Sequence, residues 1–266
     1  MSRKAPTEPG TWSLPELDRM WHPATWFLRP VDPHRGHYGW EILILVLGGY
    51  ANIIANRFLD DFWHLPFNLG VMAVALVIAR RAGVTWSEMG LRTDRVPRGL
   101  VVGGIVIAVI GLGMVVAVAI PFTRELFYDD RVIGTPVWEV LADALVRIPL
   151  ATALFEEVFF RGIVFGMFLR RTAPFWAATG SAFFFGLWHI LPTLETIEVN
   201  PAGDLFNGAI GLIVAGAGAV LGTMAAGYGF TWLRLVANST VAPWLAHIGT
   251  NSTAMLAALF VVHVIG

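Results

Sequence analysis

The chain contains a series of apolar stretches that are long enough to cross a lipid bilayer, and these restrict the folds open to it. About 20 apolar residues span the hydrocarbon core as a helix. Of the 266 residues, 56% are hydrophobic and only 14% charged. We therefore predict an all-α membrane protein, a polytopic bundle of about seven transmembrane helices. The expected helices cover residues 40–58, 65–80, 99–121, 137–170, 174–191, 207–236 and 241–265.

The polar N-terminal segment differs from the rest of the chain. Residues 1–38 hold six prolines and scattered charges, without an apolar core behind a basic start, so no cleavable signal peptide is expected. We interpret residues 1–38 as a cytoplasmic N-terminal tail and residues 39–266 as one transmembrane helical domain. Tryptophans could lay part of the tail along the lipid headgroups or pack on nearby loops.

The basic residues alternate along the chain in a way that predicts an orientation. Five Lys or Arg lie in the tail, five between the second and third helices, and Arg170 and Arg171 in the turn after the fourth helix. The loop before the sixth helix carries Glu195, Glu198 and Asp204 and no basic residue. By the positive-inside rule, the protein is integral to the cell membrane with a cytoplasmic N-terminus and its C-terminus outside.

Composition also excludes several function classes. The net charge is −1 and there is no basic run, so nothing indicates a nucleic-acid partner. Without cysteine, the chain has no disulfides, thiol catalysis or thiolate metal sites. No internal repeat supports an inverted-repeat transporter, so an ion- or proton-coupled carrier is the weakest of the functions considered.

Two adjacent glutamates and an arginine interrupt the fourth apolar stretch in the string FEEVFFRG. Ionisable groups at bilayer depth are costly and are usually kept for a function. Glu157 and Arg161 are i,i+4 neighbours, so we expect an ion pair that orients the helix. Glu156 points about 100° away and has no local counter-charge, which suits a general base. The alternative is a buried ion-pair cluster that only holds helices together.

Two further motifs add histidines at similar depth. His189 follows the tight turn near residue 172 by about as many residues as Glu156 precedes it, so antiparallel packing brings the two together. Phe185, one turn earlier, is expected to form an apolar wall beside His189. His247 and Asn251 share one helical face and could hold a water or metal and stabilise an oxyanion, or act as interhelical hydrogen-bonding groups.

His247 poses a geometric problem, because it follows the turn at residues 238–240 by only a few residues. Convergence with Glu156 requires the fourth and fifth helices to extend farther than that turn. We expect Asp143 and Arg147 to form a structural i,i+4 pair, and His64 and His263 to lie at the membrane interface. There is no HExxH or GxGD pattern and no serine-protease signature, so those intramembrane chemistries are excluded.

Three motifs in order resemble the CPBP family, which includes type II CAAX prenyl endopeptidases, lysostaphin-resistance-protein-A-like proteins and bacteriocin-immunity proteins. They are EEVFFR at 156–161, FGLWH at 185–189 and HIGTN at 247–251, and MGLR at 89–92 is similar to a linker found upstream in the family. The resemblance covers roughly residues 85–260, with the protease-like motifs at about 137–260.

The resemblance implies an intramembrane CAAX-protease-like metalloendopeptidase acting on a peptide or membrane-protein substrate, with a cavity open toward the cytoplasm. Glu156 would activate water with His189 as its partner. His247 and Asn251 would complete the site, while Glu157, Arg161 and Phe185 would support it. A divalent metal such as zinc could be held by Glu156, His189 and His247, and a metal-free Glu–His pair is equally compatible.

A non-enzymatic function remains the main alternative. A membrane scaffold or bacteriocin-immunity-type protein could use the same polar cluster to bind a partner or to fix the fold.

Overall fold

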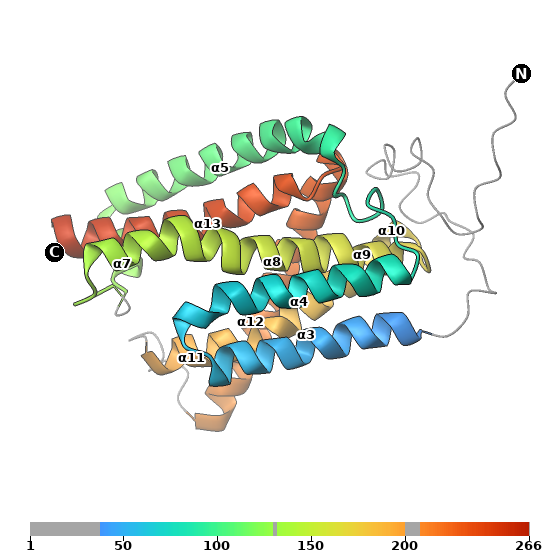
Figure 1. The fold of residues 1–266 in the computed structure, drawn as a ribbon. Helices are drawn as coiled ribbons and strands as arrows, with labels where there is room; N and C mark the ends of the chain where they lie inside the picture. Colours follow the sequence, from blue (N-terminus) through green and yellow to red (C-terminus); the bar gives the residue numbers. More distant parts are fainter. Residues whose placement is uncertain (1–37, 130–131, 200–207, 266) are drawn as a thin grey trace, which may run out of the picture.

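The computed structural model describes residues 38–129, 132–199 and 208–265, and throughout these ranges the regular structure is helical (Figure 1). The expectation of an all-α membrane protein is therefore confirmed. The predicted tail lies outside the described residues except for Tyr38. The helices are α3 (Gly39–Phe58), α4 (Asp61–Arg81), α5 (Val96–Ala119), α6 (Pro121–Arg124), α7 (Val137–Ala142), α8 (Leu154–Glu156), α9 (Phe165–Leu169), α10 (Pro174–Trp188), α11 (Ile190–Val199), α12 (Gly208–Ala237) and α13 (Val241–Phe260).

Five helical stretches in the described ranges are long and apolar enough to cross a membrane. They are Gly39–Phe58, Phe62–Arg81, Thr93–Ala119, Gly208–Ala237 and Val241–Ile265. These five coincide with five of the seven expected helices. The other two differ, because residues 137–169 carry several charges and α10 has only 15 residues. The protein is thus polytopic with five candidate spans, and seven crossings stay a prediction.

The expected fourth helix, 137–170, is helical from 137 to 169 but is α-helical for only part of this length. Two π-helical segments, η3 (Asp143–Ala153) and η4 (Glu157–Val164), flank the short α8. Pro149 lies inside η3 and cannot donate a backbone hydrogen bond. Two carbonyls of this stretch also accept side-chain donors: Trp244 Nε1 donates to Pro149 O at 2.8 Å, and Asn68 Nδ2 donates to Ala151 O at 2.8 Å. π-helical turns are frequent at functional sites.

The expected fifth helix, 174–191, is wrong at its C-terminal end. The structure ends α10 at Trp188, places His189 at its C-cap, and starts α11 at Ile190. Pro192 gives the physical reason, because it has no N–H to donate to the carbonyl of Trp188, four residues earlier. Asn52 of α3 supplies the missing donor, with Nδ2 2.9 Å from Trp188 O.

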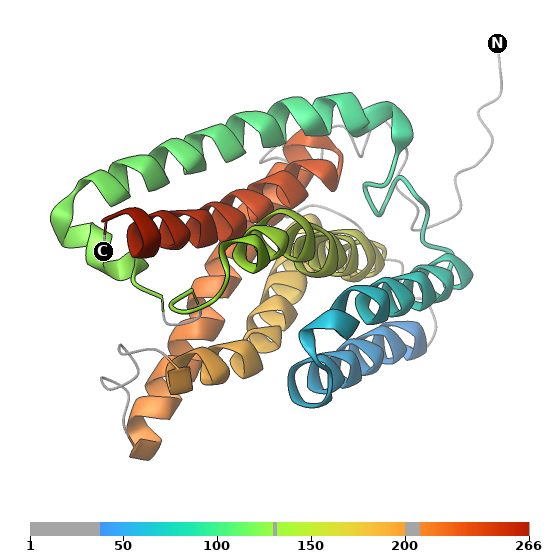
Figure 2. The same ribbon diagram turned by 60° about the vertical axis from the view of Figure 1, so that its left-hand side comes forward.

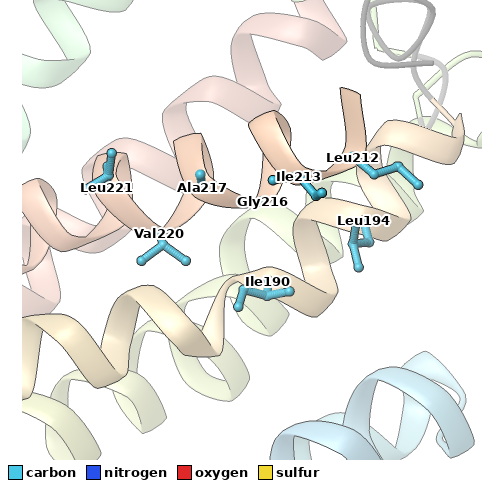
Figure 3. A pocket seen from close by; sticks show the side chains of 8 residues that line it. All are labelled: Ile190, Leu194, Leu212, Ile213, Gly216, Ala217, Val220 and Leu221. Atoms are coloured by element: carbon cyan, nitrogen blue, oxygen red, sulfur yellow. The ribbon is translucent and has the colours of Figure 1, made fainter. Parts of the chain in front are cut away.

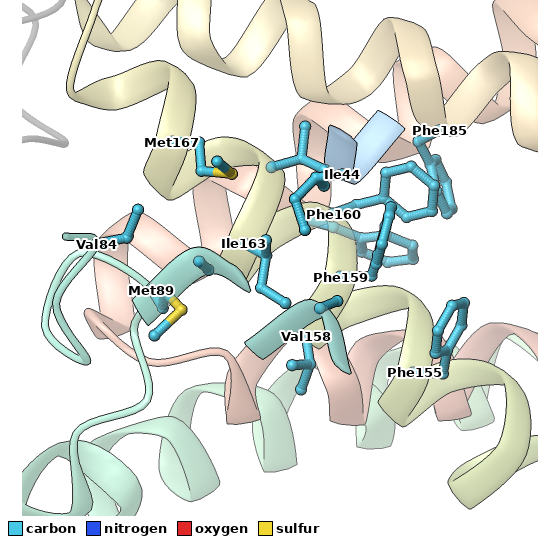
Figure 4. Packing of buried hydrophobic residues seen from close by; sticks show 14 of the residues in the cluster. Ile44, Val84, Met89, Phe155, Val158, Phe159, Phe160, Ile163, Met167 and Phe185 are labelled. Atoms are coloured by element: carbon cyan, nitrogen blue, oxygen red, sulfur yellow. The ribbon is translucent and has the colours of Figure 1, made fainter. Parts of the chain in front are cut away.

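The helices pack in pairs around the 137–169 stretch. α5 runs along α13 at one edge of the bundle, and α3 with α4 forms the other edge (Figures 1 and 2). α12 packs against α10. The buried core gathers aromatic side chains of the 137–169 stretch, including Phe155, Phe159 and Phe160 (Figure 4). The central stretch that carries both glutamates is therefore enclosed by its neighbours.

An apolar groove of about 620 Å³ separates α11 from α12 (Figure 3). Small residues of α12, Gly216 and Ala217, form its floor beside Ile190 and Leu194 of α11. Such small residues let membrane helices approach closely. Exposed apolar side chains also cover much of α5 and α12. A hydrocarbon environment would cover these surfaces without a cost in free energy.

Candidate active site

Glu156 lies at the centre of a buried polar cluster. Its Oε1 accepts a hydrogen bond from Trp188 Nε1 at 3.0 Å. Its Oε2 is buried and has no hydrogen-bond partner among the described residues. Nε2 of His189 lies 3.9 Å from Oε2, and Nε2 of His247 lies 3.8 Å from it. These separations are too long for direct hydrogen bonds but fit a bridging water.

Each of the two histidines forms a hydrogen bond through its second ring nitrogen, Nδ1. His189 Nδ1 lies 2.8 Å from Phe185 O, and His247 Nδ1 lies 2.8 Å from Glu157 Oε1. Since a carbonyl and a carboxylate only accept, each neutral imidazole carries its proton on Nδ1. In this tautomer each Nε2 carries a lone pair, and each Nε2 lies within 4 Å of Glu156 Oε2. The expected matching depth of Glu156 and His189 is confirmed.

The expected pair of Glu157 and Arg161 is present. Arg161 Nη1 donates to Glu157 Oε1 at 2.9 Å, and both side chains are fully buried. The guanidinium carbon lies 3.8 Å from the ring centroid of Phe185 and 5.0 Å from that of Phe230. A buried cation over two aromatic faces is stabilised by their negative faces as well as by the carboxylate. Glu157 thus connects the central helix to α13 through His247.

The convergence of His247 with Glu156 required the 238–240 turn to lie deeper than the neighbouring helix ends. The structure brings His247 Nε2 to 3.8 Å from Glu156 Oε2, and Asn238, Ser239 and Thr240 of the turn are all buried. Thr240 N donates to Gly90 O at 3.0 Å, so the segment before α5 covers the turn. His247 also stacks on Phe230, with ring centroids 5.1 Å apart.

A cavity of about 670 Å³ reaches the cluster and is lined by Glu156, His189 and Asn251. His247 lies behind this lining, with 3% of its side chain exposed. The side chain of His189 is 21% exposed, so solvent can approach the cluster from the cavity. Phe185 packs against His189 as expected, with ring centroids 4.4 Å apart. Other polar residues that line the cavity are Asn56, His64, Asn68, Arg147 and Thr152.

Sequence reasoning missed the residues that position Glu156. Trp188 binds its Oε1, and the Trp188 ring packs among Phe155, Phe159 and Phe160 at centroid distances of 5.5, 6.5 and 5.7 Å. Asn52 then holds the carbonyl of Trp188. The available signal was Pro192, whose position predicts an unpaired carbonyl four residues earlier.

Two minor expectations have different outcomes. The Asp143–Arg147 pair is present, with Nη2 2.6 Å from Oδ2, although Arg147 also lines the cavity. His64 lies in the first turn of α4 and lines the cavity, with its Nε2 2.9 Å from Ala55 O, and its expected place at the membrane interface stays a prediction.

The tentative metal ligands Glu156, His189 and His247 do not form a preformed metal site. Among the described residues, no group of three or more His, Asp or Glu side chains is arranged to hold a metal ion. The 3.8 and 3.9 Å donor separations are wider than the roughly 3.4 Å between ligand atoms around tetrahedral zinc.

Comparison with protein families identifies the part of the chain that carries this site. Residues 137–253 match the family model described as type II CAAX prenyl endopeptidase Rce1-like. The match includes Glu156, Glu157, His189, His247 and Asn251 and excludes α3, α4 and α5. Residues 137–253 therefore form an Rce1-like domain of the CPBP family. No curated protein and no solved structure matches the chain.

Proposed function

We propose that this Rce1-like domain makes the chain an intramembrane endopeptidase that hydrolyses a peptide bond with a water activated by Glu156. The observation that carries the proposal is the unpartnered Oε2 of Glu156, with two imidazole Nε2 atoms 3.8 and 3.9 Å away. A water between them could donate one proton to Oε2 and the other to an Nε2. The exposed edge of His189 lets a peptide approach this water from the cavity.

The first chemical step follows from these positions. Glu156 removes a proton from the water while the water oxygen attacks the carbonyl carbon of the peptide bond. A new C–O bond forms, and the carbonyl electron pair moves to its oxygen. Asn251, on the cavity surface, is placed to donate its amide N–H to the resulting oxyanion.

The second step returns the proton. The Glu156 carboxyl transfers it to the amide nitrogen, the C–N bond breaks, and a new carboxylate and a new amine leave. Glu157 and Arg161 touch no substrate in this scheme. They hold His247 with its Nδ1 protonated, so that Nε2 stays an acceptor.

The proposal is tested with the purified full-length chain and an internally quenched farnesylated CAAX peptide, alongside the same peptide without the farnesyl group. In water enriched in ¹⁸O, cleavage should add one ¹⁸O atom to the new carboxylate. Turnover of either peptide with this label supports hydrolysis. An intact chain that cleaves neither peptide would overturn the assignment and favour a scaffold or immunity-type function.

A further inference from the structure

We propose that the catalytic cavity opens on the extracytoplasmic side of the membrane, so that its substrates are peptide segments presented on the outer face. The inference depends on the proposed function only in treating the peptide that enters the cavity as a substrate. The position of the cavity mouth follows from the fold, and its side of the membrane follows from the charges.

The cavity is lined from one end of the bundle. We call this the cavity end: it holds the turn between α3 and α4, the connection from α5 to α7, and α11. The lining takes Asn56 from the last turn of α3, His64 from the first turn of α4, Leu126 after α5 and Pro192 in α11. From α13 the lining residues are Thr250 to Ala258, in its later part.

The opposite end is the arginine end, which holds Tyr38, the 82–95 segment, the 170–173 turn and the 238–240 turn. The two ends are separated by the length of the helices (Figure 1).

The arginine end is closed over the site by the 82–92 segment. Glu88 and Met89 are fully buried, and Met89 belongs to the main hydrophobic core. Arg234 Nη2 donates to the Glu88 carbonyl, and Arg170 Nη1 lies 3.2 Å from Glu88 Oε2. Gly90 has φ +70°, and a Cβ there would lie 3.0 Å from Arg234 Nε. The 82–92 segment thus covers the site at the arginine end, whereas the cavity lining comes from the cavity end, so we place the access route at the cavity end.

The charges assign the two ends to the two sides of the membrane. Within the described part of the chain, the arginine end carries Arg80, Arg81, Arg92, Arg95, Arg98, Arg170, Arg171 and Arg234, accompanied by the acidic residues Glu41, Glu88 and Asp94. The basic residues at the cavity end are Arg57, Arg124 and Arg147, accompanied by the acidic residues Asp60, Glu125, Asp129, Glu139 and Asp143. Lys and Arg accumulate on cytoplasmic loops. The arginine end is therefore cytoplasmic and the cavity end faces outward.

This assignment brings two of the expectations from the sequence into conflict. Charge predicted a cytoplasmic N-terminus, and the family resemblance implied a cavity open toward the cytoplasm. The start of α3 and the cavity mouth lie at opposite ends of the bundle, so the two expectations cannot both hold in this fold. The charge distribution of this chain favours the first.

The test uses the absence of native cysteine, which lets one introduced thiol report on one position. Leu126→Cys places a thiol at the cavity mouth, where the native side chain is 80% exposed. Thr93→Cys is the matched variant at the exposed arginine end. In intact cells, a membrane-impermeant maleimide should label Leu126→Cys, whereas Thr93→Cys should react only after permeabilisation.

A third variant, Thr152→Cys, reports on the cavity wall itself. A small impermeant thiosulfonate applied to intact cells should modify it as fully as in permeabilised cells. Labelling of Thr93→Cys from outside, or protection of Thr152→Cys until permeabilisation, would overturn the proposal. Thiol labelling does not require the protein to be catalytically active. A wrong orientation would therefore leave the peptide assay of the purified chain unaffected, and an inactive chain would leave the labelling pattern interpretable.

Discussion

Glu157 and His247 are joined by a 2.8 Å hydrogen bond between Oε1 and Nδ1, across 90 residues of sequence. The same oxygen accepts from Arg161 at 2.9 Å, so one carboxylate oxygen fixes both a buried cation and a histidine tautomer. In the preceding residue, Glu156, the Oε2 atom has no hydrogen-bond partner among the described residues. The two adjacent glutamates thus have separate environments: Glu157 binds a cation and a histidine through Oε1, whereas Glu156 lines the cavity.

The buried ion pair should be strongly coupled. Replacing one partner of such a pair leaves an uncompensated charge and costs about 3–5 kcal/mol. Arg161→Met and Glu157→Gln should each lower the thermal unfolding midpoint markedly in detergent. The double variant should be less destabilised than the sum of the two, because neither charge remains buried alone. Additive losses would show that the pair is not coupled in the folded protein.

Trp188 should act on catalysis through Glu156. Trp188→Phe keeps an aromatic ring against Phe155 but removes the N–H that donates to Glu156 Oε1. A hydrogen bond to a charged group contributes about 1.5–3 kcal/mol, so kcat should fall roughly tenfold to a hundredfold. KM should change little, because Trp188 positions the base and does not bind the peptide.

The matched control for this variant is Trp176→Phe, on the same helix and 61% exposed. It should leave both constants unchanged. A raised KM with an unchanged kcat in Trp188→Phe would assign Trp188 to substrate binding instead.

The close contact between α10 and α12 should be sensitive to one methyl group. A Cβ at Gly186 would lie 2.8 Å from Val220 O, so Gly186→Ala must push the two helices apart one turn before His189. We expect a loss of about 1–3 kcal/mol in the free energy of unfolding, together with reduced activity. Gly222→Ala on α12 meets nothing within 4 Å and should be neutral or slightly stabilising. Equal behaviour of the two variants would argue against this packing.

Metal removal distinguishes the water held by side chains from a metal-bound water. The donor separations around Glu156 Oε2 favour the first, so cleavage should persist after dialysis against a strong chelator. The measurement is the initial rate before and after dialysis, with added zinc as a further sample. Complete loss that zinc restores would instead assign Glu156, His189 and His247 as ligands.

Much of the fold could be predicted because bilayer length and helical periodicity act locally. Five long helices lie close to their expected ranges, and the i,i+4 pair of Glu157 and Arg161 needed only helical spacing. The meeting of Glu156 with His189 followed from equal distances to one tight turn. These inferences depend on single helices or on a single turn.

The remaining features depend on contacts between distant segments. The π-helical winding around Pro149 is stabilised by donors from Trp244 and Asn68, far away in sequence. The depth of the 238–240 turn depends on the segment that covers it. Asn52 lies on α3, outside the family match, yet it holds the carbonyl of Trp188. Spacing within one helix carries no information about such partners.

The activity of Glu156→Gln tests the central claim most directly. The substitution keeps the shape of the side chain and an acceptor for Trp188 but removes the base. General bases contribute about 10²–10⁴ in rate, so kcat of the purified variant should fall by that factor. Glu139→Gln, an exposed glutamate earlier in the same helical stretch, should retain wild-type turnover. Cleavage by Glu156→Gln at the wild-type rate would contradict the assignment of Glu156 as the residue that activates water.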